Sequence, residues 1–327
     1  MKFARRRLSE DDLEKNRGFR FIALMLGANV VFNRPVAGLF SDVGSTRSFA
    51  ALNVVKARMK SVNSIRKITK AMKMVAGSKL RHDERRMQVG LPFAKPSQDL
   101  MKRLPTDKIP LAPQVTFVGL TSDRGLCGGV NSGVARQVRN RIIDLEAQGK
   151  EVKYIGVGAK GTNALKRLFG DRFVCSCEDV QKNVWNFAQA SAVAERLLAT
   201  DPQSVYLVYN HFKSAISYET TALRLVSKNE ARSLDKSEWS KAIDQYSFEP
   251  SVFEMWDDLH EFYYASAIFG AMLDGIASEQ SARMAAMGNA SKNAGEMLDK
   301  LTLQYNKVRQ TKITTELCEI ISGTTAL

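Results

Sequence analysis

The chain has 327 residues and 44% hydrophobic content, which allows two domains and at least one proper core. Its net charge of +14 and its pI near 9.6 favour acidic partners, namely nucleic acid, an anionic membrane surface or an acidic protein surface. Four scattered cysteines exclude a disulfide framework and indicate a reducing compartment. No apolar run reaches the ~18 residues that a membrane-spanning helix needs.

The first 49 residues have the composition of an import signal. The stretch from Arg17 to Phe49 is rich in arginine and has Asp42 as its one acid. It ends on Arg47-Ser48-Phe49, which is similar to the pattern at mitochondrial presequence cleavage sites. The acids at positions 10–14 do not fit such a signal; a false upstream start codon or an atypical presequence would explain them. We predict a presequence over residues 1–49 and exclude it from the fold.

A long helical pattern follows over residues 51–88. Its apolar residues recur mostly at spacings of three and four, with charges on the opposite side. At ~1.5 Å per residue such a helix is ~55 Å long. A helix of this length with a narrow apolar stripe is stable by winding on a second helix. The stripe is predicted to consist of Leu52, Val55, Met59, Val62, Ile65, Ile68, Met72, Val75 and Leu80.

Short β-rich runs alternate with helical patterns in the middle of the chain. This alternation predicts an αβ lobe with a mostly parallel, helix-flanked sheet of Rossmann-like type. We expect strands at residues 115–121, 151–157, 173–177, 204–212 and 217–226, and helices at residues 132–147, 162–168 and 188–199.

The first of two glycine clusters that resemble nucleotide-binding loops runs from Gly156 to Gly161. It fits G-x-G-x-x-G, follows a strand and opens a helix, and Glu178 and Asp179 lie about 20 residues further on. A full βα unit precedes it, however, and no separate substrate domain follows. A tight βα turn is therefore the favoured interpretation, and a dinucleotide site is the alternative.

The second glycine cluster runs from Ser122 to Gly129 and lacks the Lys-Ser/Thr of a phosphate-binding P-loop. We interpret Asp123, Arg124, Gly125 and Gly128 as a structural turn, in which Asp123 and Arg124 form a clamp rather than a catalytic pair.

Other residues with metal-binding or catalytic chemistry are scattered. Cys175-Ser176-Cys177 lacks a second pair, and because adjacent strand residues point to opposite faces we expect no shared metal. The three histidines are far apart and no hydrolase or metalloprotease motif is present. The sequence therefore gives no grounds for predicting catalytic, cofactor-binding or metal-binding residues.

The second long helical pattern covers residues 253–321, a length of ~100 Å. Ala294, Leu298, Leu301, Tyr305 and Val308 follow a 4-3-4-3 spacing, which gives two heptads. Beyond them the register slips to Ile313, Leu317 and Ile320, a local change in winding. The end is uncharged after Glu319, whereas a free helix end normally carries Lys or Arg. An apolar tip suggests insertion into a sleeve.

These patterns divide the chain into four parts. After the presequence, we expect a coiled-coil helix and linker at residues 50–110, the αβ lobe at 111–245 and a second coiled-coil helix at 246–327. The two long helices are predicted to pair, with the lobe inserted between them in the sequence.

Three blocks of the sequence resemble the γ subunit of rotary ATP synthases, of the mitochondrial type. The first is Ser61-Val62 with residues 67–76, and the second runs from Ser122 to Gly128. The third runs from Ser278 to Met284 and continues in order through Lys292-Asn293-Ala294, Leu301-Thr302-Leu303, Arg309-Gln310 and Ile313-Thr314. The similarity covers about residues 50–327.

The resemblance implies a central stalk of two antiparallel helices inside a hexamer of α and β subunits. The lobe would form part of a foot, together with δ/ε-type subunits, on the membrane c-ring. Ion flow would rotate the stalk, and ATP would be made on the β subunits. The chain itself would then be non-catalytic and without cofactor, bind no nucleic acid, and lie peripherally on the matrix side of the mitochondrial inner membrane.

The resemblance also assigns residue roles. It places Arg309 and Gln310 at polar contacts with a loop of one catalytic subunit, where a guanidinium suits bidentate carboxylate binding. Met72, with Lys70 and Lys73, would face an acid-rich arm of β; for Met72 alone, the coiled-coil core is an equal alternative. The apolar bearing at the tip would consist of Ile320, Ile321 and Leu327.

Two other classes of function are alternatives. A dinucleotide-dependent oxidoreductase would use Gly156 to Gly161, and Gly158→Val should abolish its cofactor binding. A basic coiled-coil protein that binds nucleic acid would show steep salt dependence. The lack of a basic recognition face with interleaved aromatic residues counts against the second.

Overall fold

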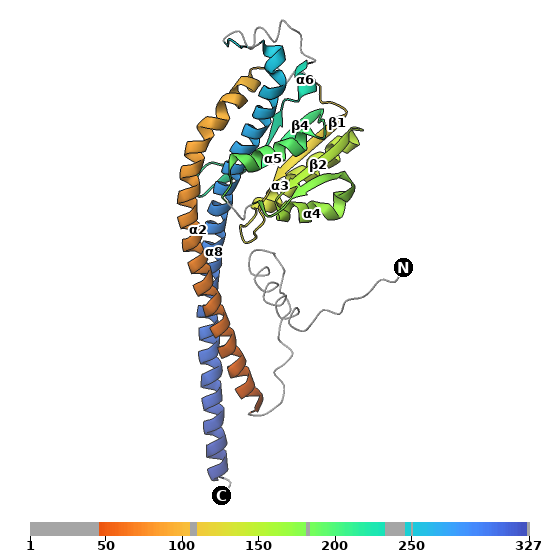
Figure 1. Ribbon diagram of the computed structural model, residues 1–327. Coiled ribbons are helices and arrows are strands. Elements are labelled where there is room, and N and C mark those ends of the chain that lie inside the picture. Colours follow the sequence, from red (N-terminus) through yellow and green to blue (C-terminus); the bar gives the residue numbers. More distant parts are fainter. Residues whose placement is uncertain (1–45, 105–109, 181–183, 233–245, 250, 326–327) are drawn as a thin grey trace, which may run out of the picture. The chain divides into compact units, whose positions relative to one another are not determined.

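The computed structural model describes residues 46–104, 110–180, 184–232, 246–249 and 251–325 (Figure 1). Residues 1–45, which make up most of the predicted presequence, lie outside this description, and helix α2 begins at Thr46, inside its predicted range. The chain divides into two compact units. Among the described residues, the helical-pair unit comprises 46–73 and 286–325, and the lobe unit comprises those from 74 to 285.

A five-stranded sheet forms the centre of the lobe unit. Its order is β3-β2-β1-β4-β5, with parallel pairing everywhere except between β4 and β5. The predicted mostly parallel sheet is therefore confirmed, with strand bounds that agree to within a residue. The strands are β1 (Gln114–Leu120), β2 (Glu151–Val157), β3 (Phe173–Cys177), β4 (Ser204–Phe212) and β5 (Tyr218–Leu225).

Helices cover both faces of this sheet (Figure 1). On one face α3 (Val130–Ala147) and α4 (Ala159–Phe169) pack on Val115, Phe117, Val152 and Tyr154. On the other face α5 (Phe187–Leu198) and segments of α2 and α8 pack on Val118, Leu120, Ile155 and Val157. Alternation along β1 and β2 separates the two cores, as expected for strands buried on both faces. A 3₁₀ turn, Gly170–Arg172, precedes β3, and the short helix α6, Lys228–Arg232, follows β5.

The two long helices are α2 (Thr46–Lys102) and α8 (Val252–Thr325). Helix α2 continues past the predicted end at residue 88, through Pro92 and Pro96. Its last turns pack on α8: a Cβ on Gly270 would lie 3.0 Å from that of Ala94, and the Ser97 and Ser266 hydroxyls are 2.6 Å apart. This packing maintains the helix although each proline removes a backbone donor.

The helical-pair unit is an antiparallel pair, as predicted. Val62 of α2 is buried against Ala294 and Leu301 of α8, with Met59 and Leu298 beside them. The predicted stripe from Ala294 to Val308 is confirmed, because all five of its residues are buried or half-buried.

The predicted stripe of α2 is wrong at two positions. Ile68 and Val75 are 58% and 56% exposed, whereas the following residues Thr69 and Ala76 are 8% and 1% exposed. Val62, Thr69 and Ala76 are each seven residues apart and therefore lie on one face, from which a one-residue shift turns a side chain by ~100°. Small side chains at Thr69 and Ala76 allow close approach of the helices. A prediction from apolar residues alone therefore misplaced the seam, the line along which α2 contacts α8.

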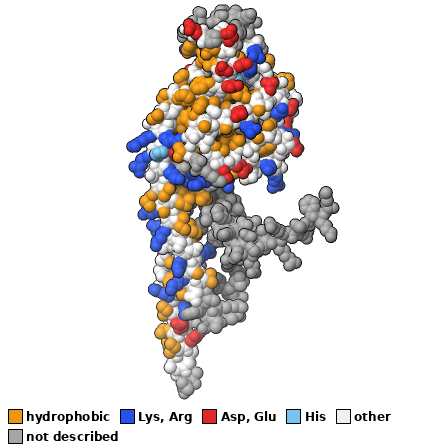
Figure 2. All heavy atoms as spheres, in the orientation of Figure 1, with side chains coloured by type: hydrophobic (Ala, Val, Ile, Leu, Met, Phe, Trp, Pro, Cys, Tyr) orange, Lys and Arg blue, Asp and Glu red, His pale blue; other side chains and the backbone are white. Residues whose placement is uncertain are grey.

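The α2 segment of the helical-pair unit is basic. Its residues 51–73 contain seven Lys and Arg and no Asp or Glu. All seven side chains are exposed, and Lys and Arg gather along the long helices in the view of Figure 2. A solvent-facing surface of one charge sign attracts an acidic partner. The seven are Lys56, Arg58, Lys60, Arg66, Lys67, Lys70 and Lys73.

Candidate functional site

The glycine motif after β2 is filled by the chain itself. Gly158 has φ +97°, and a Cβ there would lie 2.1 Å from the Thr121 carbonyl oxygen. A Cβ on Gly161 would lie 2.5 Å from the Thr121 hydroxyl oxygen. In a dinucleotide-binding fold such glycines make room for a pyrophosphate. Here they make room for Thr121 at the end of β1.

The amide groups at the start of α4 are also occupied. The Asp123 carboxylate accepts a hydrogen bond from the Ala159 amide at 2.9 Å, and the Thr121 hydroxyl accepts one from Gly161 at 3.0 Å. The negative Asp123 carboxylate stands at the helix N-terminus, where a phosphate would otherwise bind. This geometry contradicts the dinucleotide alternative.

The turn from Ser122 to Gly129 is held by a small polar network. The Asn131 amide donates to the Ser122 hydroxyl at 2.7 Å and to the Cys127 sulfur at 3.2 Å, and the Ser122 hydroxyl donates to the Arg124 carbonyl at 2.7 Å. The Arg124 side chain is exposed, so Asp123 and not Arg124 joins this turn to α4. Gly128 has φ +63°, a conformation that favours glycine.

The same turn is attached to helix α8. Arg283 donates to the Gly125 carbonyl at 3.4 Å and forms a partly buried ion pair with Glu279, one helical turn before it. Ala282 packs with Cys127. The second and third sequence blocks named above therefore meet here. Sequence reasoning gave Glu279 and Arg283 no role, although their i,i+4 spacing indicates an ion pair.

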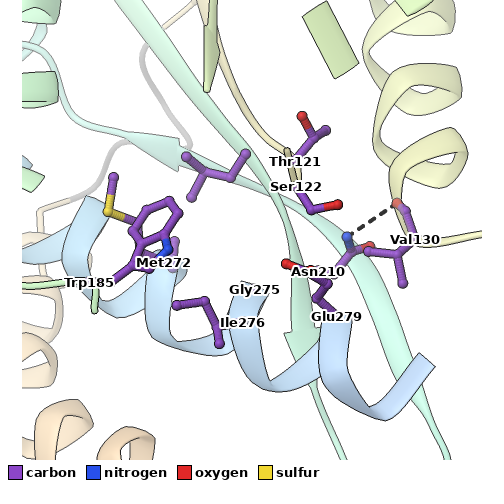
Figure 3. Close-up of a pocket in the computed structure, with 11 residues that line it drawn as sticks. Thr121, Ser122, Val130, Trp185, Asn210, Met272, Gly275, Ile276 and Glu279 are labelled. Atoms are coloured by element: carbon purple, nitrogen blue, oxygen red, sulfur yellow. Dashed lines mark hydrogen bonds between the residues drawn. The ribbon is translucent and has the colours of Figure 1, made fainter. Parts of the chain in front are cut away.

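A cavity of about 20 Å³ lies where the carboxyl ends of β1 and β4 meet (Figure 3). In open α/β sheets this position, where the strand order reverses, is the usual place for a ligand. Ser122 and Asn210 line it from the sheet, and Gly275, Ile276 and Glu279 line it from α8. The volume suits about one water molecule. Helix α8 therefore occupies the space that a nucleotide would need.

The buried ionisable groups near the end of β5, Glu230 and His260, have hydrogen-bond partners. Glu230 accepts hydrogen bonds from Arg224 at 2.8 Å and from the Ser227 amide at 3.1 Å. His260 is 2% exposed, and its Nε2 lies 2.9 Å from the Val226 carbonyl oxygen. Burial lowers the pKa of His260 below its usual 6.5, so the neutral imidazole donates from Nε2. These groups are structural, and within the described ranges no three or more His, Cys, Asp or Glu gather as a metal site.

The end of α8 is exposed and carries a stripe of apolar side chains. From Arg309 to Thr325 every residue except Lys312 is exposed, and Ile313, Leu317, Ile320 and Ile321 are each more than half exposed. Arg309 and Gln310 begin this stretch. The four apolar residues follow a spacing of three and four and therefore form an exposed apolar stripe on one side of the helix, which marks a protein interaction site.

The remaining predicted contact residues lie on α2 or beyond the described range. Lys70 and Lys73 are exposed and Met72 is half-buried. The side-chain stem of Lys73 runs over Gly288 of α8, where a Cβ would lie 3.6 Å away. Met72 therefore combines partial burial with access to solvent. Leu327, the last predicted tip residue, lies outside the described residues.

Comparison with known proteins identifies the family. The sequence model of a family described as ATP synthase matches residues 51–327. The mitochondrial ATP synthase subunit gamma of Drosophila melanogaster is 40% identical over 286 residues, covering 86% of this chain and 92% of the fly protein. The mitochondrial F(1) complex subunit gamma of Rattus norvegicus is 38% identical, covering 85% and 100%. The chain belongs to the ATP synthase gamma subunit family.

Solved structures agree with this membership. A chain of the Tetrahymena thermophila mitochondrial ATP synthase central stalk and c-ring is 34% identical, with a TM-score of 0.56, covering 68% of this gamma-family chain and 99% of its own length. A chain of the Euglena gracilis mitochondrial ATP synthase rotor has a TM-score of 0.61 at 19% identity, covering 81% and 99%, and shares the fold. Among the described residues, no helix of the gamma-family chain is long and apolar enough to span a membrane.

Proposed function

We propose that this chain is the central rotor shaft of a proton-driven ATP synthase. Rotation of the membrane c-ring turns the shaft, and the shaft drives the α/β hexamer so that ADP and phosphate become ATP on the β subunits. The observation that carries the proposal is the exposed apolar end of α8 in a gamma-family chain. An apolar stripe that the described part of the chain leaves uncovered needs a sleeve formed by other subunits.

The proposed partners follow from the same surfaces. The α and β subunits surround the helical pair, and the basic α2 segment faces an acidic arm of β. The lobe contacts δ/ε-type foot subunits and the c-ring. Catalysis belongs to the β subunits, since the lobe's glycine turns are closed by Thr121 and Asp123. The proposed location is the matrix side of the mitochondrial inner membrane, reached through a presequence at residues 1–49.

The first experiment is purification of the assembled complex through this chain. An affinity tag inserted at the exposed turn around Gly149 leaves the end of α8 free. Gentle purification from native membranes should recover α and β at about three copies each per tagged chain, with ATPase activity. Recovery of the chain alone, or with nucleic acid, would reject the rotor function.

Arg309 is the residue that we expect to transmit force to a catalytic subunit. Arg309→Ala should lower ATP turnover of the assembled complex by at least about tenfold, equivalent to about 1.4 kcal/mol. Truncating one partner of a buried charge pair costs about 2–5 kcal/mol, which accommodates such a loss. Arg309→Lys should not restore turnover, because Lys lacks the planar fork.

Lys307→Ala provides the matched control, since Lys307 is also an exposed cation, two residues away on α8. It should leave turnover close to that of the wild type. Thermal unfolding of all three variants should match the wild type, because neither side chain is buried. Wild-type turnover in the Arg309→Ala complex would remove the proposed contact.

A further inference from the structure

The thiols of Cys175 and Cys177 lie on one face of β3. The sequence-based expectation that they point to opposite faces is wrong, because they are two residues apart and not one. Cys175 pairs with Ile155 of β2 and Cys177 with Val157, and all four pack on the same core.

A register shift in the ladder precedes Cys175, between Tyr154 and Ile155. Phe173 consequently packs on the other core of the sheet. Such an irregularity changes the face of the sheet on which the following side chains lie. Cys175 and Cys177 are therefore brought together under α5.

Both thiols are free, half-buried and at the edge of the sheet. Burial raises the pKa of both thiols, and the neighbouring Cys177 raises that of Cys175 further. The Arg196 guanidinium of α5 opposes the rise at both positions. The two thiols thus interact with each other and share one neighbouring cation.

The separation of Cys175 and Cys177 does not favour a disulfide between them. Residues two apart on a strand have Cα atoms about 6.6 Å apart, near the upper end of the range of about 4.4–6.8 Å that disulfides accept. A bridging metal ion accommodates a wider sulfur separation than an S–S bond. Thiolate ligands select soft ions, of which Cu(I) is the monovalent physiological example.

We propose that Cys175 and Cys177 form a two-thiolate site for a soft monovalent cation of the Cu(I) class. On binding, each S–H group loses its proton to solvent, two sulfur–metal bonds form, and the metal keeps its oxidation state. The resulting centre carries one negative charge, which Arg196 offsets. In the described part of the chain no third His, Cys, Asp or Glu completes the site, which suits a linear ion and not tetrahedral zinc.

The test uses Ag(I), a soft monovalent ion that is stable to redox change, as the probe on the reduced full-length chain. Titration calorimetry should give one Ag(I) per chain with release of two protons. Because binding removes two protons, affinity should rise by up to about a hundredfold per pH unit below the thiol pKa values. Cu(I), delivered from a competing chelator of known affinity, should bind at the same stoichiometry.

Three variants locate the site. Cys175→Ser and Cys177→Ser should each weaken binding by about a hundredfold or more, since each loses the effective concentration that the second thiol provides. Cys318→Ser removes an exposed lone thiol and should bind like the wild type. Circular dichroism and metal-free thermal unfolding establish that each variant is folded.

Thermal unfolding with Ag(I) gives a second readout. The ion should raise the unfolding temperature of the wild type and of Cys318→Ser, and not that of the double variant Cys175→Ser/Cys177→Ser. Wild-type affinity in the double variant, loss of binding only in Cys318→Ser, or near-normal affinity in both single variants would each overturn the proposal.

Discussion

Thr121 links the two glycine turns of the lobe. Its hydroxyl donates to the Val157 carbonyl at 3.0 Å and accepts from the Gly161 amide at the same distance. Its backbone oxygen fills the space where a Cβ of residue 158 would lie. Gly158 and Gly161 are therefore required because any side chain at either position would clash with Thr121 of the neighbouring turn.

Gly158 and Gly170, at the two ends of α4, form a matched pair for testing this. Gly158→Ala should lower the free energy of unfolding by about 1–3 kcal/mol or more, because φ is +97° and the new Cβ would clash with Thr121. Gly170→Ala should be neutral or stabilising by up to about 1 kcal/mol, since its φ is −53° and a Cβ there meets nothing within 4 Å. Urea unfolding of the full chain measures both, and equal midpoints would refute the contact.

His260 predicts a specific loss of stability in acid. Its pKa in the folded chain is lowered, so the unfolded chain binds the proton more tightly. The contribution of His260 to the free energy of unfolding is therefore fully present above its unfolded pKa near 6.5. This contribution is lost as the pH falls through 6.5 towards the folded pKa. The slope for one proton is at most about 1.4 kcal/mol per pH unit.

His260→Gln is the variant that isolates this effect. Glutamine keeps a donor for the Val226 carbonyl but does not titrate. Between pH 7.5 and 5.5 the wild type should lose more stability than His260→Gln in urea unfolding, while all other ionisable groups are unchanged. Parallel pH profiles would show that His260 does not take up the proton on unfolding.

At the scale of elements, helix α8 places glycines in two different environments. Gly275 lines the small cavity of Figure 3, and a Cβ there meets nothing within 4 Å. Gly275→Ala should stabilise the chain by about 1 kcal/mol through helix propensity. Gly270→Ala should destabilise it instead, because its Cβ would lie 3.0 Å from that of Ala94. Thermal unfolding distinguishes the two; a gain at Gly270 or a loss at Gly275 would contradict this description of the packing.

Periodicity predicted the elements well where one physical cause dominated. The strands could be delimited because apolar residues on a doubly buried sheet end abruptly at turns. The end of α2 could not, because contacts such as Ser97 with Ser266 outweigh two prolines. The seam was misplaced at Ile68 because close helix packing selects small residues, here Thr69.

The candidate site was only partly predictable. The sequence predicted a structural turn between β1 and α3, but it did not predict the partner of Asp123, which lies 36 residues further along the chain, at Ala159. A local sequence pattern cannot predict a contact between residues that are so far apart in the chain. The exposed end of α8 was readable from composition, since an uncharged helix terminus is unusual in water.

At the scale of the whole molecule, the residues that stabilise the fold differ from those that we propose to bind other subunits. The lobe and the paired part of the long helices bury their own apolar side chains, as Val62 and Leu301 do. Residues 309–325 do not, although they continue the same helix to Thr325. Removing them should therefore affect assembly and leave folding intact.

A chain truncated after Val308 tests this separation. Its unfolding midpoint should stay within the equivalent of about 0.5 kcal/mol of the wild type, as for changes at exposed positions. Its recovery of α and β subunits with ATPase activity should fall, because the proposed bearing is gone. Leu301→Ala is the contrasting variant: it empties a buried position, should cost about 2–5 kcal/mol, and keeps the tip. Full ATPase activity and recovery with the truncated chain would assign the sleeve contact to residues before Arg309.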